Sequence, residues 1–343
     1  MSGRPATGAA PRAAHADDLL AERALRRLEL TVVRRLDGLL HGDYLGLFPG
    51  PGSEPAEARE YVPGSDDVRR MDWNVTARTT VPHVRDLTAD RELETWTLVD
   101  ATASMDFGTA RMEKRDLAVA AVAAVGFLTA RTGNRLGAFL AHGGTVRSIP
   151  AQTGRTALLG LLRQLRSLPR TPPTGPAGPP LGTVADALRR AARRPGLVVV
   201  VSDFLDGLHD QDAPAWELPL RRLATRHQLL AVEVVDPREL DLPDVGLLTV
   251  VDPETGRRRE VATASRRLRE RYRLAAQARH DAIRAALRRA GAAHLLLRTD
   301  QDWVRAIARH VTTQRRLAAA PPAGAAARTH ARPWSARPSG GTA

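Results

Sequence analysis

The chain has no cysteine, and this absence removes several kinds of chemistry at once. Without thiols there is no disulfide, no thiolate metal site and no cysteine nucleophile, and the composition fits a reducing compartment. Only oxygen atoms and imidazole nitrogens remain as metal ligands. Long apolar runs are missing as well: no segment reaches the roughly 20 residues that a membrane span needs, and the N-terminus lacks the apolar core of a signal peptide. The sequence therefore predicts a cytoplasmic protein without a membrane span.

Lysine is nearly absent too, because Lys114 is the single lysine among 51 Lys and Arg residues in a chain with a formal net charge of +13. Arginine together with abundant alanine, glycine and proline is typical of a genome-wide composition bias. We therefore interpret the positive charge as background rather than as a nucleic-acid-binding surface. The 343 residues, 43% of them hydrophobic, are sufficient for a sizeable core in one large domain with appendages, or in two domains.

An apolar run ends abruptly at Asp100 in the stretch from Thr97 to Asp106, and hydroxyl groups follow at Thr102 and Ser104. A strand that is apolar on both faces is typical of the centre of a parallel sheet, where helices cover both sides. Ligands of such sheets bind beyond the carboxyl ends of the strands. Asp100 is therefore predicted to lie where a metal ion or a chemical reaction would be found.

A second apolar run, LVVVVSDFLDG, ends in the same way at Asp203. Strands ending at Asp100 and Asp203 can be neighbours in a doubly wound sheet, which would bring both carboxylates to one crevice. Thr183 lies near the start of a predicted helix, where its hydroxyl can cap the helix or face the same crevice. Two carboxylates with the hydroxyls of Thr102, Ser104 and Thr183 form an oxygen-only site. Such a site suits Mg²⁺ or Mn²⁺ rather than Zn²⁺.

Apolar runs and amphipathic segments alternate from about residue 93, which predicts an α/β domain with a doubly wound, mostly parallel sheet and helices on both faces. The segments before this domain predict one helix with a single apolar stripe, and then a small β-rich subdomain that packs near the sheet. Both ends of the chain are low in complexity and are predicted to be disordered. The predicted parts are a disordered 1–15, a helix at 16–40, the β-rich subdomain at 41–92, the α/β domain at 93–315 and a disordered tail at 316–343.

In their order along this alternation, Asp100-x-Thr102-x-Ser104, Thr183 and Asp203 resemble the metal-ion-dependent adhesion site of the von Willebrand factor A fold. The usual first motif of that site is Asp-x-Ser-x-Ser, and Thr102 keeps the hydroxyl of the serine that it replaces. By this resemblance Asp100, Thr102, Ser104 and Thr183 would hold one divalent cation directly or through water, with Asp203 closing the shell. An open coordination position would accept an Asp or Glu side chain of a partner, because the ion neutralises two acidic groups that otherwise repel each other.

The segment upstream of this strand narrows the resemblance to one family. The stretch REYVPGSDDVRRMDWNVTART, followed by a strand that ends in Asp-x-Thr-x-Ser-Met, is similar to the bacterial "domain of unknown function 58" group of von Willebrand A-like proteins. The resemblance covers residues 40–235, and Ser65 interrupts a Gly-Asp pair of the family pattern. It implies a protein-binding module that is not an enzyme and that works with a MoxR-type AAA+ ATPase in the assembly or maturation of other proteins. The implied partners are this ATPase and a client protein that offers an acidic side chain.

Two other functions remain open at this point. Asp100 could accept a phosphoryl group, but haloacid-dehalogenase-like enzymes want a second Asp where this chain has Thr102, and no Walker A, GxSxG or HExxH motif occurs. The Arg-rich helix predicted at 263–290 could bind nucleic acid or an acidic surface. Its arginines are interleaved with Glu270 and Asp281 along an apolar stripe, so a solvated helix packed on the sheet explains this segment better.

Overall fold

The computed structural model describes residues 23–36, 58–61, 71, 73–79, 81–85, 94–130, 134–172, 178–208, 213–253 and 255–319. Six strands form one large sheet, and their order across it is β10-β7-β6-β3-β4-β5. All neighbours run parallel except β4 and β5, which form an antiparallel pair at one edge. The strand bounds are β3 Glu94–Asp100, β4 Arg135–His142, β5 Thr145–Gln152, β6 Gly196–Ser202, β7 Gln228–Val235 and β10 Ala293–Arg298.

The strand order reverses between β3 and β6, and this is the topological switch point of the sheet. The chain runs from β3 outward through β4 to β5, then returns to β6 and continues through β7 to β10. Connections after β3 and β6 therefore leave in opposite directions, and ligands of doubly wound sheets bind beyond the carboxyl ends of the strands at such a point; we call this region the crevice. Because Val99 pairs with Val201 in the β3–β6 register, Asp100 and Asp203 leave the sheet from adjacent strands.

The two central strands are buried along nearly their whole length, as their apolar sequences predict. Gly196 begins β6 at a point where the backbone of β3 comes very close. A Cβ atom there would lie 2.0 Å from the carbonyl oxygen of Glu94, and a backbone atom inside a sheet has little freedom to move away. Glycine at this position therefore allows the close pairing that sets Asp100 beside the end of β6.

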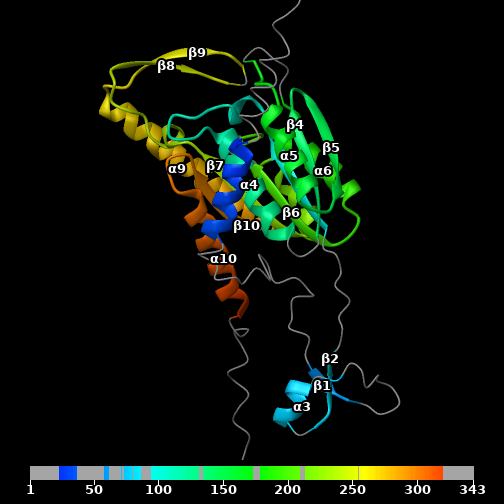
Figure 1. Ribbon diagram of the computed structural model, residues 1–343. Helices are drawn as coiled ribbons and strands as arrows, with labels where there is room; N and C mark the ends of the chain where they lie inside the picture. Colours follow the sequence, from blue (N-terminus) through cyan, green and yellow to red (C-terminus); the bar gives the residue numbers. More distant parts are fainter. Residues whose placement is uncertain are drawn as a thin grey trace, which may run out of the picture.

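Helices cover both faces of the sheet (Figure 1). One face packs against residues 23–36, α4, α5 and α10, and the other face packs against α6, α7 and α9. This arrangement confirms the predicted fold class, an α/β domain with a doubly wound, mostly parallel sheet between two helical layers. The helix bounds are α4 Lys114–Ala130, α5 Arg155–Ser167, α6 Leu181–Ala191, α7 Glu217–Ala224, α9 Arg266–Arg289 and α10 Trp303–Ala319.

The segments at the two ends of the domain are helical and pack on each other. The helix predicted at 16–40 is described from residue 23 to Leu36, and its last turn, η1 Val32–Leu36, is a π-helix. Leu25, Val32 and Leu36 are buried against the core, in keeping with the predicted apolar stripe. Helix α10 contacts η1 and continues to Ala319, beyond the predicted domain end at residue 315.

Two smaller pieces complete the described structure. Within the predicted β-rich subdomain, β1 Ala58–Glu60 pairs antiparallel with β2 His83–Arg85, and α3 Trp73–Thr79 contacts β2. The other piece is the hairpin of β8 Leu247–Val251 and β9 Arg258–Ala262 (Figure 1), which follows α8 Pro237–Leu240 and precedes α9 in the sequence. The predicted disorder at 1–15 and beyond 319, and most of segment 41–92, fall outside the described residues. In the part of the chain that is described, no helix is both long and apolar enough to cross a bilayer.

Candidate metal centre

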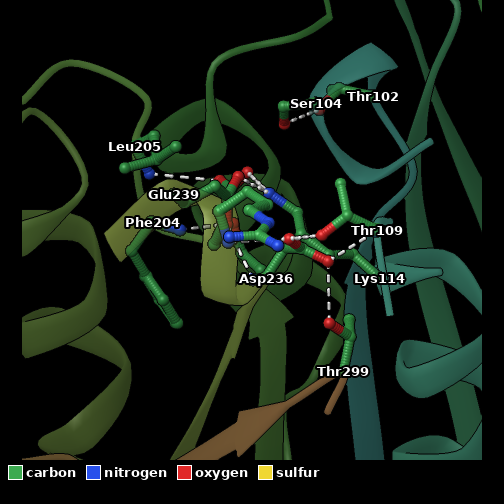
Figure 2. A network of polar contacts seen from close by, with 12 residues as sticks. Thr102, Ser104, Thr109, Lys114, Phe204, Leu205, Asp236, Glu239 and Thr299 are labelled. Carbon is green, nitrogen blue, oxygen red and sulfur yellow. Dashed lines mark hydrogen bonds and ion pairs between the residues drawn. The ribbon is translucent and has the colours of Figure 1, made fainter. Parts of the chain in front are cut away.

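Asp100 is the last residue of β3, and both oxygens of its carboxylate accept hydrogen bonds. Oδ1 accepts from the backbone N–H of Thr102 at 3.0 Å and from Thr102 Oγ1 at 2.7 Å. Oδ2 accepts from Ser202 Oγ at 2.7 Å, which connects Asp100 to the end of β6. Thr102 Oγ1 lies 3.3 Å from Ser104 Oγ, and both side chains are partly exposed (Figure 2). The Asp-x-Thr-x-Ser spacing therefore places one carboxylate and two hydroxyls on a single loop.

Asp203 follows β6 in a strained turn. The next residue, Phe204, has a φ of 57°, in the left-handed region that bulky side chains rarely adopt. Its N–H donates to Ser202 Oγ at 3.0 Å, and Oδ1 of Asp203 accepts the N–H of Leu205 at 3.2 Å. The Phe204 ring is fully buried against Trp216, with ring centroids 5.3 Å apart. This packing maintains a backbone conformation that costs on the order of 1–3 kcal/mol, and it fixes the position of Asp203.

Lys114 is a member of this site that the sequence motif does not contain. It lies at the start of α4 with its side chain fully buried. The ammonium Nζ donates to Oδ2 of Asp203 at 2.8 Å and to Oε1 of Glu239 at 2.6 Å (Figure 2). The sequence alone could have drawn attention to Lys114, because it is the single lysine of an arginine-rich chain.

A wider network joins the carboxyl ends of the strands around this ammonium. Oε2 of Glu239 accepts the N–H of Asp236 at 2.9 Å, as part of a capping box at the start of α8. The Asp236 carboxylate in turn accepts from Thr109 N and Oγ1 at 2.8 and 2.5 Å, and from Thr299 Oγ1 at 2.8 Å (Figure 2). The ends of β6, β7 and β10 and the loop after β3 are therefore held together by one polar network.

Comparison with known protein families identifies the family of this chain. The model of the family described as "Protein of unknown function DUF58" matches residues 57–282. The chain belongs to the DUF58 family. Uncharacterized protein Rv1480 of Mycobacterium tuberculosis (strain ATCC 25618 / H37Rv) is 52% identical over 304 residues, which are 89% of this chain and 93% of that protein. Uncharacterized protein MAV169 of Mycobacterium avium is 44% identical over 140 residues, 41% of this chain and 79% of that protein.

Two solved structures resemble this DUF58 protein at low sequence identity. The conserved hypothetical protein BatB from Bacteroides thetaiotaomicron has a TM-score of 0.42 and 14% identity, covering 65% of this chain and 99% of its own. The SpRpn10 VWA domain has a TM-score of 0.38 and 10% identity, covering 63% of this chain and 93% of its own. The family match confirms the predicted resemblance to the domain-of-unknown-function 58 group of von Willebrand A-like proteins.

In this DUF58 protein the crevice carries more negative than positive charge. The carboxylates of Asp203 and Glu239 contact the Lys114 ammonium, and Asp100 adds a third carboxylate beside Asp203, so these four groups carry a net charge of two negative when all are ionised. Burial, together with repulsion from Asp203, raises the pKa of Asp100 to about 6. Burial also raises the pKa of Glu239, despite the nearby Lys114 ammonium. Burial acts in the same direction on Asp203, but Lys114 outweighs it and holds the pKa of that carboxyl below its ordinary value.

The donor set of the crevice fits a hard divalent cation. No group of three or more His, Asp or Glu side chains is placed to hold a metal ion anywhere in the described ranges. A cation beside Asp100 would therefore take most of its ligands from hydroxyls and water, which Mg²⁺ and Mn²⁺ accept readily. Its two positive charges would balance the crevice and favour the ionised form of Asp100. Asp100, Thr102 and Ser104 are the residues that would hold it.

Thr183 lies in the first turn of α6 with an exposed side chain, and it makes no hydrogen bond with the other predicted ligands within the described structure. Helix α6 begins earlier than predicted, at Leu181, because Oδ2 of Asp206 accepts the Leu181 N–H at 2.7 Å. Ligation by Thr183 stays a prediction. The loop before α6 does reach the site, since a Cβ atom on Gly178 would lie 2.1 Å from Cγ2 of Thr102.

Proposed function

We propose that this protein is a non-enzymatic protein-binding module whose crevice binds one Mg²⁺ or Mn²⁺ ion. The observation that supports this proposal most is the position of Asp100 and Asp203 at the topological switch point, with the partly exposed hydroxyls of Thr102 and Ser104 beside them. Protein oxygens supply only part of an octahedral shell here, so water or a carboxylate from another protein completes it. The module would therefore bind a partner through an Asp or Glu side chain.

Removal of Asp100 is expected to abolish cation binding. Calorimetric titration of the chelator-treated wild type with Mn²⁺ should reveal one site per chain, and Asp100→Ala should give no binding heat because the one carboxylate of the Thr102–Ser104 loop is lost. Asp203→Ala should weaken binding by about 10–100-fold, the usual effect of losing an outer-shell partner.

The matched control for this titration is Asp281→Ala, which removes an exposed carboxylate from α9. This variant should bind Mn²⁺ as the wild type does. If Asp100→Ala and Asp203→Ala also bind Mn²⁺ with wild-type affinity, the cation site is wrongly assigned.

The proposed macromolecular partners are a MoxR-type AAA+ ATPase and an acidic client protein. The ATPase is proposed from the family resemblance, whereas one structural feature supports an acidic client. A polar pocket beside the loop that leads from the candidate metal centre to α4 is lined by Arg111, Arg115, Arg166 and Arg170. Glu113 and Asp116 line it as well, Arg170 pairs with Glu113 at 2.8 Å and Arg115 pairs with Asp106 at 2.5 Å, so Arg111 and Arg166 supply the unbalanced positive charge. An acidic segment bound there would contact the loop that connects the candidate metal centre to α4.

Association with the ATPase is expected to depend on the cation. Tagged wild-type protein should retain the MoxR-type ATPase encoded nearest to its own gene in Mg²⁺ buffer, and should release it when EDTA is added. Asp100→Ala should retain little ATPase in either buffer, while Asp281→Ala should behave as the wild type. Absence of association under every condition would rule out this partner, and retention that EDTA leaves unchanged would rule out the metal bridge.

The two rival functions gain little support from the structure. Thr102, which cannot act as an acid at neutral pH, occupies the position where a phosphotransferase would need its general acid, and it donates to Asp100 instead. Several arginines of α9 are paired with carboxylates: Arg273 with Glu270, Arg284 with Asp281 and Arg289 with Glu217. Nucleic-acid binding would instead appear as DNA retention that falls steeply with salt and that Asp100→Ala leaves unchanged.

A further inference from the structure

Lys114 is an ammonium enclosed between two carboxylates at the base of the crevice. Its side chain has no exposed surface, and the side chain of Asp203 is 4% exposed. Nζ lies 2.8 Å from Oδ2 of Asp203 and 2.6 Å from Oε1 of Glu239. The backbone is fixed as well, because the Lys114 N–H donates to the carbonyl oxygen of Phe107 at 2.8 Å. Both ends of this residue are therefore held in place.

The choice of lysine is informative because this chain uses arginine at every other strongly basic position. An ammonium is a compact charge with three donors, whereas a guanidinium is a planar fork that needs more room and prefers to meet one carboxylate side-on. At Lys114 two carboxylate oxygens converge on one nitrogen atom, one from the turn after β6 and one from α8. This geometry explains why a lysine occurs here although the chain otherwise uses arginine.

The Lys114 ammonium donates a hydrogen bond to one of the two carboxylate oxygens of Asp203. Oδ2 accepts from Nζ, and Oδ1 accepts the N–H of Leu205 at 3.2 Å. A divalent ion in direct contact with this carboxylate would lie close to Nζ, and two positive charges repel strongly where water is excluded. Direct ligation by Asp203 and the Lys114 ion pair therefore oppose each other.

Building on the proposed cation site, we propose that Lys114 is a positioning residue for that site: it holds Oδ2 of Asp203 beside Glu239, so that Asp203 acts on a bound ion through water and not as a direct ligand. The ion then keeps an additional water molecule that a partner carboxylate can replace. Lys114 also connects the site to α8, because the other oxygen of Glu239 accepts the N–H of Asp236 at the start of that helix.

The test compares Mn²⁺ affinity, and the number of water molecules on bound Mn²⁺ measured by water-proton relaxation, in the wild type and in Lys114→Met/Glu239→Gln. The double variant removes one positive and one negative charge, so the net charge of the crevice is unchanged while Asp203 is released. We expect Mn²⁺ to bind about tenfold tighter and to carry one water fewer, because Asp203 becomes a direct ligand.

Chemical rescue provides a conservative control. The chain has no cysteine, so Lys114→Cys can be alkylated with 2-bromoethylamine in denaturant and refolded, which restores an ammonium of nearly the same length at this one position. The alkylated protein should regain the wild-type affinity and the wild-type number of waters. Glu239→Gln, which keeps Lys114 paired with Asp203, should bind Mn²⁺ more weakly and with the wild-type number of waters.

Each outcome decides between the alternatives. Wild-type affinity and hydration in Lys114→Met/Glu239→Gln would overturn the role of Lys114 and leave the proposed cation site standing. If the double variant does not fold, the single variant Glu239→Gln decides. Loss of a water molecule from Mn²⁺ in that variant would overturn the role of Lys114. A wild-type protein that binds no Mn²⁺ would overturn the cation site itself, and this inference with it.

Discussion

Asp100→Asn is expected to make the cation-free protein more stable and, at the same time, to abolish its stabilisation by Mg²⁺. The Asp100 carboxylate is buried beside Asp203, and these two effects raise its pKa from 3.8 to about 6. One pKa unit corresponds to about 1.4 kcal/mol, so the ionised form costs up to about 3 kcal/mol at neutral pH. Asparagine keeps the shape without the charge, and we expect a gain of about 1–3 kcal/mol in the free energy of unfolding. Thermal melts in EDTA should show a rise of roughly 2–4 °C for each kcal/mol.

The pH dependence of this gain has a defined sign. A carboxyl group whose pKa is raised in the folded state binds its proton more tightly there, so its cost is present above the folded value and disappears as the pH falls. The advantage of Asp100→Asn over the wild type should therefore be full at pH 8 and should shrink as the pH falls through about 6 toward 3.8. Equal melting temperatures of the two proteins in EDTA at pH 8 would contradict the proposed cost of the buried Asp100 charge.

Added Mg²⁺ should reverse the order of the two proteins. A ligand that binds the folded state stabilises it in proportion to the logarithm of its concentration above the dissociation constant, so the wild-type melting temperature should rise with Mg²⁺. Asp100→Asn should show no such rise, because Mg²⁺ is bound mainly through carboxylates and the amide lacks the negative charge. Asp281→Asn, the exposed control on α9, should respond to Mg²⁺ as the wild type does.

Glu233→Gln is expected to destabilise the domain by about 2–4 kcal/mol through a second buried charge cluster, on β7. The Glu233 side chain is 1% exposed and lies between two histidines from different elements. His280 Nδ1 on α9 is 2.6 Å from Oε1, and His294 Nε2 on β10 is 2.7 Å from Oε2. Glutamine lacks the negative charge that faces both imidazoles, and its amide N–H requires one imidazole to give up the tautomer or protonation state that suits the carboxylate. Urea unfolding at pH 7 measures the difference.

The destabilisation by Glu233→Gln should fade at acidic pH. Burial disfavours the Glu233 charge, but His280 and His294 outweigh it and lower the pKa below the ordinary 4.5. A lowered carboxyl pKa contributes stability that is present above the ordinary value and is lost as the pH falls through the folded value. The gap between the two proteins should therefore be full at pH 7 and should close below pH 4.5. A gap that stays constant down to pH 3 would contradict this assignment.

The control for Glu233→Gln is Glu270→Gln on the same helix that carries His280. Glu270 pairs with Arg273 at 2.6 Å, but both side chains are about half exposed. Exposed ion pairs contribute little to stability because water and salt screen them. The unfolding curve of Glu270→Gln should therefore overlie that of the wild type.

Local patterns explain why much of the site could be predicted. Two apolar runs of strand length, each ending in an aspartate, predicted that Asp100 and Asp203 stand at carboxyl ends of buried strands, and the structure places both there. The Asp-x-Thr-x-Ser spacing brings Thr102 and Ser104 beside Asp100 through contacts only two residues apart in sequence. Such contacts depend on the local backbone alone, so the sequence is sufficient to predict them.

Other features depend on partners that are distant in sequence. Local capping patterns predict a start of α6 near Thr183, but the helix begins at Leu181, whose N–H donates to Asp206 across 25 residues of sequence. Asp236-Pro-Arg-Glu239 has the sequence pattern of a capping box, which predicts the hydrogen bond from the Asp236 N–H to the Glu239 side chain. The same pattern does not predict the ion pair of Glu239 with Lys114. Lys114 meets Asp203 across 89 residues and Glu239 across 125.

By itself, the sequence determined the α/β alternation, the two aspartate-terminated strands and the Asp-x-Thr-x-Ser loop with its oxygen-bearing side chains, because periodicity and spacing act over a few residues. Only the tertiary structure decided that β3 and β6 are neighbours, that one lysine stands between Asp203 and Glu239, and that Thr183 is exposed. The charge state of a buried group depends on which other groups surround it in space. That arrangement follows from the packing of the whole sheet and its helices, and no local pattern contains it.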